Sequence, residues 1–120
     1  MMAAAREEEY KRVLRAVESG DNAAKTRLAW FKLAGLWGCE LDEDGAVKLL
    51  EERVKDKDGT AMWMLGLCCE YGMGIEQDVK RAEELYKRSS DGGDVVGRWF
   101  SWRWRHERGS GVTDMRFCGL

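Results

Sequence analysis

Glycine recurs at a fixed interval along this chain, and this spacing limits the possible folds more than any other feature. Three glycines are separated by 37 residues each: Gly35, Gly72 and Gly109. Three aspartates are separated by 36 residues each: Asp42, Asp78 and Asp114. Two independent series with nearly the same period indicate an internal repeat.

Each repeat is predicted to be a pair of helices. The first helix of each pair is expected at 23–34, 60–71 and 96–108. Each ends at a periodic glycine, because glycine adopts at low steric cost the left-handed conformation that closes a helix. A second glycine, Gly74 or Gly111, lets the loop turn back, and the periodic aspartates are expected to cap the second helices. Small residues four positions later would let the paired helices approach closely: Ala46, Ala82 and Cys118.

The repeat spacing divides the chain into a single domain over residues 6–118. Its parts are a lone helix at 6–20, repeat 1 at 21–58, repeat 2 at 59–93 and a partial repeat 3 at 94–118, with tails at 1–5 and 119–120. The composition, with 44% hydrophobic and 35% charged residues and no proline, is typical of a soluble helical domain.

The middle copy, AMWMLGLCCEYGMGIEQDVKRAEELY from Ala61 to Tyr86, resembles the Sel-one-like repeat, a relative of the tetratricopeptide repeat. The signature positions over the three copies are Leu28, Gly35, Asp42, Ala46, Ala61, Leu65, Gly66, Gly72, Gly74, Asp78, Ala82, Tyr86, Gly109, Gly111 and Asp114. The resemblance implies an all-α fold, a short right-handed α-solenoid (an α/α superhelix) of helix-turn-helix repeats. It also implies a non-catalytic adaptor or scaffold whose partners are other proteins.

An aromatic row is expected on the first helices, on the side opposite their small and leucine residues. It consists of Trp30, Trp37, Trp63, Phe100 and Trp104, and Leu67 lies on the same predicted binding face. In solenoids of this type the first helices line the concave surface, so the row is predicted to bind a partner peptide or protein there. The alternative is that these side chains pack the first helices of adjacent repeats against one another.

The segment Arg98–Arg108, RWFSWRWRHER, alternates arginines with aromatic residues. Such a segment suits RNA binding, the alternative function, because arginine neutralises phosphates and aromatic rings stack on bases. A net charge of −2 argues against a dedicated nucleic-acid binder. Only MRFCGL follows Asp114, so the terminal helix is expected to keep an uncovered apolar surface and to favour self-association.

Residues that carry catalysis or hold metals are scarce in the sequence. The four cysteines form no CxxC pair, and His106 is the one histidine. We therefore expect no enzyme activity, no metal site and no cofactor. The sequence begins without an apolar signal region and has no run of about 18 apolar residues, so a cytoplasmic protein without a membrane span is expected.

Overall fold

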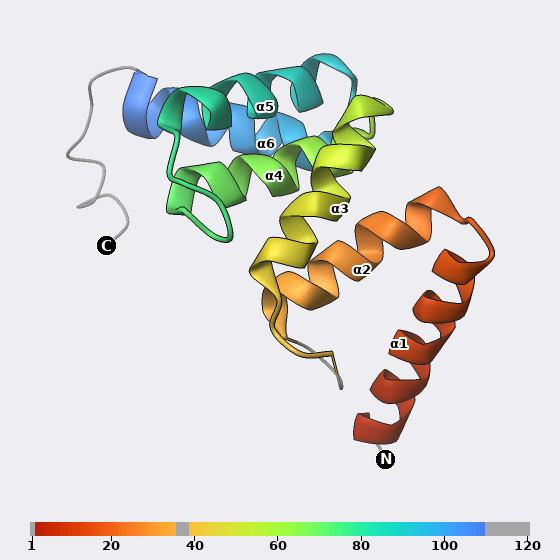
Figure 1. The fold of residues 1–120 in the computed structure, drawn as a ribbon. Coiled ribbons are helices and arrows are strands. Elements are labelled where there is room, and N and C mark those ends of the chain that lie inside the picture. Colours follow the sequence, from red (N-terminus) through yellow and green to blue (C-terminus); the bar gives the residue numbers. More distant parts are fainter. Residues whose placement is uncertain (1, 36–38, 110–120) are drawn as a thin grey trace.

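The computed structural model describes residues 2–35 and 39–109, which form a succession of helices (Figure 1). These are α1 (Met2–Glu18), α2 (Asn22–Ala34), α3 (Glu43–Lys55), α4 (Gly59–Tyr71), α5 (Val79–Asp91) and α6 (Val95–Trp104), and α6 continues into a π-helical turn at Arg105–Gly109. No strand occurs in this part of the chain. The predicted all-α class is confirmed.

Aspartate side chains define where five of the helices begin. In each case the carboxylate accepts a hydrogen bond from a backbone N–H of the first turn, which would otherwise lack a partner. The capping residues of α2 to α6 are Asp21, Asp42, Asp58, Asp78 and Asp94. The predicted capping by Asp42 and Asp78 is confirmed, whereas Asp114 lies outside the described residues.

The periodic glycines Gly35 and Gly72 end α2 and α4, as predicted. Gly35 and Gly72 have φ of 61° and 69°, and their N–H groups donate to carbonyls of the preceding turn. Gly74 also has a positive φ, and a β-carbon there would lie 2.5 Å from the carbonyl oxygen of Glu43. Glycine is therefore required at residue 74 by space as well as by conformation. Gly111 lies outside the described residues.

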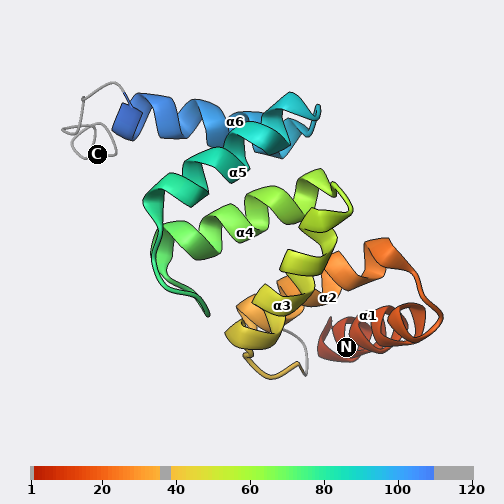
Figure 2. The same ribbon diagram turned by 45° about the horizontal axis from the view of Figure 1, so that its top comes forward.

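Successive helices pack against one another along the whole array. Each helix contacts the next, and α2 also contacts α4, as α4 contacts α6. Figures 1 and 2 show α4, α5 and α6 side by side at one end and α1 at the other. We call α2, α4 and α6 the first helices and α1, α3 and α5 the second helices, because α2–α3 and α4–α5 form the two complete pairs.

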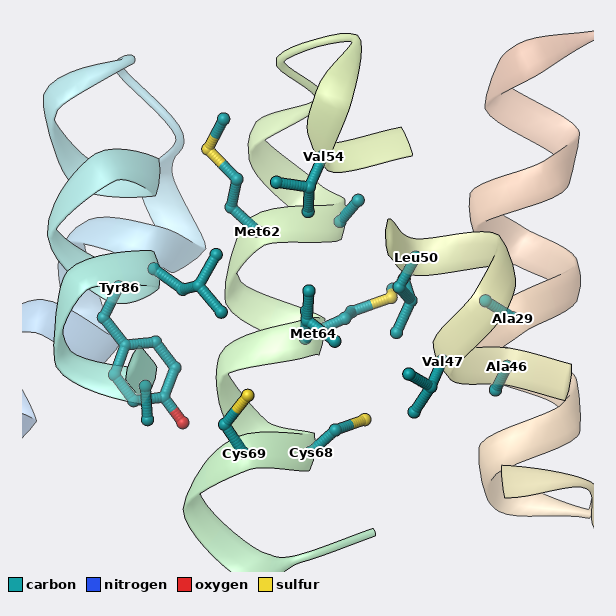
Figure 3. Packing of buried hydrophobic residues seen from close by; sticks show 14 of the residues in the cluster. Ala29, Ala46, Val47, Leu50, Val54, Met62, Met64, Cys68, Cys69 and Tyr86 are labelled. Carbon is teal, nitrogen blue, oxygen red and sulfur yellow. The ribbon is translucent and has the colours of Figure 1, made fainter. Parts of the chain in front are cut away.

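The core consists of two clusters of buried side chains. The larger one joins α2 to α6 and includes Leu50, Leu65 and Tyr86, all fully buried. Within it, Met64 extends from α4 toward Leu50 of α3 (Figure 3). The smaller cluster joins α1 and α2 and consists of Val13, Ala24, Leu28, Phe31 and Cys39. Leu49 contacts both clusters, so the array is held together by continuous apolar packing.

Two of the three small residues predicted between paired helices are described, and both have the expected burial, whereas Cys118 lies outside the described residues. Ala46 and Ala82 are completely buried, as is the signature residue Ala61. Gly66 is buried as well, directly against the ring of Tyr86. Close approach of the helices explains why these positions are small.

The N-terminal helix is longer than the sequence predicted. It begins at Met2 rather than Arg6, because the alanines at 3–5 favour helix. Among the described residues, no helix combines the length and apolar character required to cross a membrane.

Candidate interaction surface

Hydrogen bonds between threonine and aspartate hold the first helices beside one another. Thr26 of α2 donates to Asp58 Oδ2 at 2.7 Å, and Thr60 of α4 donates to Asp94 Oδ2 at 3.2 Å. The other oxygen of each aspartate caps its own helix. One carboxylate therefore positions both its own helix and the preceding first helix.

Aromatic rings connect the three first helices. The rings of Trp30 and Trp63 lie 6.5 Å apart edge to face, and those of Trp63 and Phe100 stack at 5.2 Å. Trp99 meets Phe100 edge to face at 5.0 Å. In the structure the aromatic row thus runs through Trp30, Trp63, Phe100 and Trp99. Its two ends, Trp30 and Trp99, are 41% and 54% exposed. The row thus packs the helices together in its middle and presents indole rings to solvent at its ends.

A groove of about 330 Å³ lies beside the exposed ring of Trp30. Its lining residues come from α2, α4 and the loop before α4: Ala23, Thr26, Arg27, Trp30, Asp58, Thr60 and Met64. The walls combine an apolar indole and thioether with hydroxyl, carboxylate and guanidinium groups. Such a mixed lining suits a peptide that offers both apolar and polar contacts.

A buried charged network joins α4, α5 and α6. Glu70 Oε1 accepts hydrogen bonds from Tyr86 Oη at 2.7 Å and from an Arg103 guanidinium nitrogen at 2.6 Å, and Glu70 is only 1% exposed. Burial and the bond to Glu70 raise the pKa of Tyr86. Burial alone would lower the pKa of Arg103, but the Glu70 carboxylate outweighs it and raises that pKa above its usual range. Arg103 therefore serves the interior of the protein.

The described residues hold no cluster of metal ligands, and the two adjacent cysteines of α4 are unreactive. They contain no group of three or more His, Cys, Asp or Glu side chains that could hold a metal ion. Burial raises the pKa of the Cys68 thiol to about 12 and also raises that of Cys69. Both sulfurs are therefore protonated at neutral pH and are poor nucleophiles.

Residues 22–52 and 59–94, more than half of the chain, match the family model of the Sel1 repeat. The chain belongs to the Sel1 repeat family. This is the family, also written Sel-one-like, that the middle copy resembles in its motif. Sel1 repeats are generally protein-interaction modules and typically act as non-catalytic scaffolds.

A solved Sel1 repeat protein has a similar structure. The crystal structure of a Sel1 repeat protein from Oxalobacter formigenes is 31% identical to this chain, with a TM-score of 0.66. The similarity covers 75% of this Sel1 repeat chain and 36% of that protein, so this chain spans about a third of its length. No curated protein matches the chain. The structural similarity confirms the α-solenoid that the repeat predicts.

In this Sel1 repeat chain, α6, the first helix of the third copy, departs from the predicted register. The periodic glycines Gly35 and Gly72 follow their capping aspartates by 14 residues, but Gly109 follows Asp94 by 15. The π-helical turn Arg105–Gly109 takes up the additional residue. Alignment from the capping aspartates therefore pairs each residue of α4 with the residue 36 positions later in α6.

This register corrects the expected positions in the third copy. Trp102, which the 37-residue glycine spacing aligns with buried Leu65, is 51% exposed, and Ser101 occupies the position of Leu65. Trp104, predicted as a binding residue, is 5% exposed and lies against Tyr86. That prediction is wrong for Trp104, because its ring belongs to the core.

The other residues predicted for binding have different environments. Trp30 is exposed, and Trp63, Leu67 and Phe100 are half-buried against the larger core cluster. Trp37 lies outside the described residues. The packing between Trp63 and Phe100 matches the alternative expectation for the row, namely contact between first helices of adjacent repeats.

Neither Trp99 nor the pair formed by Glu70 and Arg103 was predicted from the sequence. Trp99 occupies the position of Trp63 once α6 is aligned from Asp94, so the 36-residue spacing of Asp58 and Asp94 was the available signal. The Arg98–Arg108 segment also divides in a way that its composition does not indicate. Arg103 is directed inward, whereas Arg98 and Arg105 are exposed.

Proposed function

We propose that this chain is a non-catalytic protein-interaction module that binds a partner peptide or protein along its first helices. The contact surface comprises the groove beside Trp30 together with the aromatic row from Trp30 to Trp99. The membership of the chain in the Sel1 repeat family supports the general role, and the proposal adds the surface.

The observation that carries this proposal is the exposure of indole rings at both ends of a rigid aromatic row. Trp30 and Trp99 are anchored by ring contacts to Trp63 and Phe100, so a partner would not have to order them on binding. Tryptophan is enriched among residues that dominate binding energy, and exposed apolar rings rimmed by polar groups mark interaction sites.

The groove supplies polar groups next to this apolar surface. Thr26 and Thr60 hydroxyls are directed to Asp58 and Asp94, and Arg27 pairs with Glu9 at 3.4 Å on the rim. A bound segment would therefore place an apolar side chain beside Trp30 and polar groups toward the capping aspartates. Such an arrangement gives binding and orientation without a reacting group.

Capture of partners from a native lysate by the immobilised chain tests the proposal. Trp30→Ala should abolish or strongly reduce specific capture, because it removes an exposed ring without opening the core. Leu41→Ala is the matched control, since Leu41 is 63% exposed and does not line the groove. Equal capture by the wild-type chain and by Trp30→Ala would overturn the proposed surface.

A further inference from the structure

In each complete pair the second helix packs against one side of its first helix, α3 against α2 and α5 against α4. Among the described residues no such helix follows α6, and the equivalent side of α6 carries different residues. A stripe of three positions makes the contact in α2, namely Lys25, Ala29 and Lys32. The same stripe on α6, aligned from the capping aspartates, is Arg98, Trp102 and Arg105.

The basic ends of this stripe have known partners in the first pair. Lys25 pairs with Glu52 at 3.0 Å, and Lys32 pairs with Asp42 at 3.4 Å, so α2 meets acidic residues at both ends of its contact with α3. Arg98 and Arg105 occupy these positions on α6. Neither guanidinium forms an ion pair with any residue that the structure describes.

The second helices also differ in charge at one position: α3 has an acidic residue where α5 has a basic one. Arg81 of α5 pairs with Glu51 of α3 at 2.5 Å. The residue of α5 equivalent to Glu51 is Lys87, which lines a groove of about 320 Å³ between α5 and α6 together with Arg105. Glu83 and Asp91 of α5 also line this groove. A helix packed in this groove would therefore meet basic Lys87, whereas the equivalent position that α5 meets is acidic Glu51.

The middle position of the stripe is small in α2 and α4 but large in α6. Ala29 and Gly66 are the small residues at this position in the first two copies, and Gly66 receives the ring of Tyr86. Trp102 replaces them in α6 and is 51% exposed. A helix on α6 cannot place a large side chain there as α5 does on α4, so it must offer a small one opposite Trp102.

We infer that the α5–α6 groove and the Arg98–Trp102–Arg105 stripe form a docking site for an acidic helix of a partner protein. The docked helix carries acidic residues opposite Arg98, Arg105 and Lys87 and a small residue opposite Trp102. This site is distinct from the groove beside Trp30, and the inference does not rest on the proposed function.

A peptide built from the sequence of α3 tests the site directly. The probe is residues 42–55 with Gly45→Glu, which faces Lys87, and Leu50→Ala, which faces Trp102. It keeps Asp42 and Glu52 for the two arginines. A second peptide retains Leu50 and is otherwise identical. Binding of both labelled peptides to the full chain is measured by fluorescence anisotropy, with circular dichroism to verify folding of each variant.

The wild-type chain should bind the alanine peptide at least about fivefold more tightly than the leucine peptide. Trp102→Ala should reverse this preference, because it restores the combination of Ala29 with Leu50. Arg98→Glu combined with Arg105→Glu should weaken binding of the alanine peptide about tenfold or more, and Asp42→Lys with Glu52→Lys in the peptide should restore it. Trp30→Ala should leave peptide binding unchanged.

Three results would overturn the inference. The first is peptide binding that is unaffected by Trp102→Ala and by the two charge reversals. The second is tighter binding of a uridine dodecamer that displaces the peptide, which would assign the surface to RNA. The third is self-association of the chain that the charge reversals abolish, without peptide binding, which would assign it to a second copy.

Discussion

Gly66 of α4 lies directly beneath the aromatic ring of Tyr86 of α5. A β-carbon at residue 66 would lie 2.7 Å from Cε1 and 2.9 Å from Cδ1 of that ring. Real contacts of this kind are not that short, so either the ring or the helix would have to move. The ring is also held by its hydrogen bond to Glu70, which restricts how it can respond.

Gly66→Ala should therefore destabilise the protein by about 1–3 kcal/mol, although alanine is the better helix former. Urea unfolding followed by circular dichroism measures the change. Gly92→Ala is the matched control, because a β-carbon there would come no closer than 3.4 Å to any neighbour, and its effect should stay within about 0.5 kcal/mol. A Gly66→Ala variant more stable than the wild type would contradict this packing.

Arg103→Met should cost about 3–5 kcal/mol, because it removes the guanidinium that compensates the charge of buried Glu70. Arg98→Met on the same helix is the control and should change stability by no more than about 0.5 kcal/mol. Combining Arg103→Met with Glu70→Gln should cost less than the sum of the single changes, because no buried charge is then left uncompensated. Strict additivity in this double-mutant cycle would argue against the pairing.

Deletion of single residues tests the register of the last helix. Removing His106 shortens the π-helical turn to ordinary helix and should change the free energy of unfolding by no more than about 1 kcal/mol, because Arg103 and Trp104 keep their places. Removing Ser101 should cost more than about 3 kcal/mol, because these two side chains then rotate away from Glu70 and Tyr86. Thermal melting of both variants gives the comparison. Equal losses would refute the alignment from Asp94.

Stability should fall in alkaline solution through Cys68. Burial raises the pKa of this thiol to about 12, whereas an exposed thiol ionises near about 8.5. The unfolded chain therefore binds fewer protons above that pH. The contribution of the protonated Cys68 thiol to the free energy of unfolding is fully present below about pH 8.5 and is lost as the pH rises toward 12. The free energy of unfolding then falls by up to about 1.4 kcal/mol per pH unit.

Urea unfolding at pH 8, 9 and 10 measures this dependence in the wild type and in Cys68→Ala. The variant is expected to be less stable at pH 8, because it loses packing, but its stability should decline less steeply with pH. Parallel slopes in the two proteins would show that Cys68 is not responsible.

The helix ends were predictable because they depend on local chemistry that the sequence repeats. Asp42 and Asp78 cap the helices that follow them, and Gly35 and Gly72 close the helices that precede them. Each role requires a particular residue type at one position, so it can be recognised in the sequence. Leu65, a signature position of the repeat, is fully buried between the same two helix-end signals.

The register of the third copy was not predictable from the glycine spacing. An additional residue between Asp94 and Gly109 can lie in the helix or in the loop, and the spacing is the same in both cases. Counting back from Gly109 placed Trp102 and Trp104 one position out of register. The spacing of Asp58 and Asp94 gives the correct alignment, because the start of α6 is fixed by its cap.

The contact between Glu70 and Arg103 could not be found by local patterns. The two residues belong to different repeats, and each lies at a position where an exposed charge would be equally ordinary. Only the packing of α6 against α4 and α5 encloses them. The aromatic row was recognised in outline, but whether a ring faces solvent or its neighbour depends on the same packing.

Asp58 and Asp94 give the array a property that no single repeat has. Each carboxylate closes the start of one helix with one oxygen and holds a threonine of the preceding repeat with the other. Fraying of either repeat breaks the threonine–aspartate hydrogen bond that joins it to its neighbour. Loss of order should therefore spread from neighbour to neighbour, so that the repeats melt together instead of opening one after another.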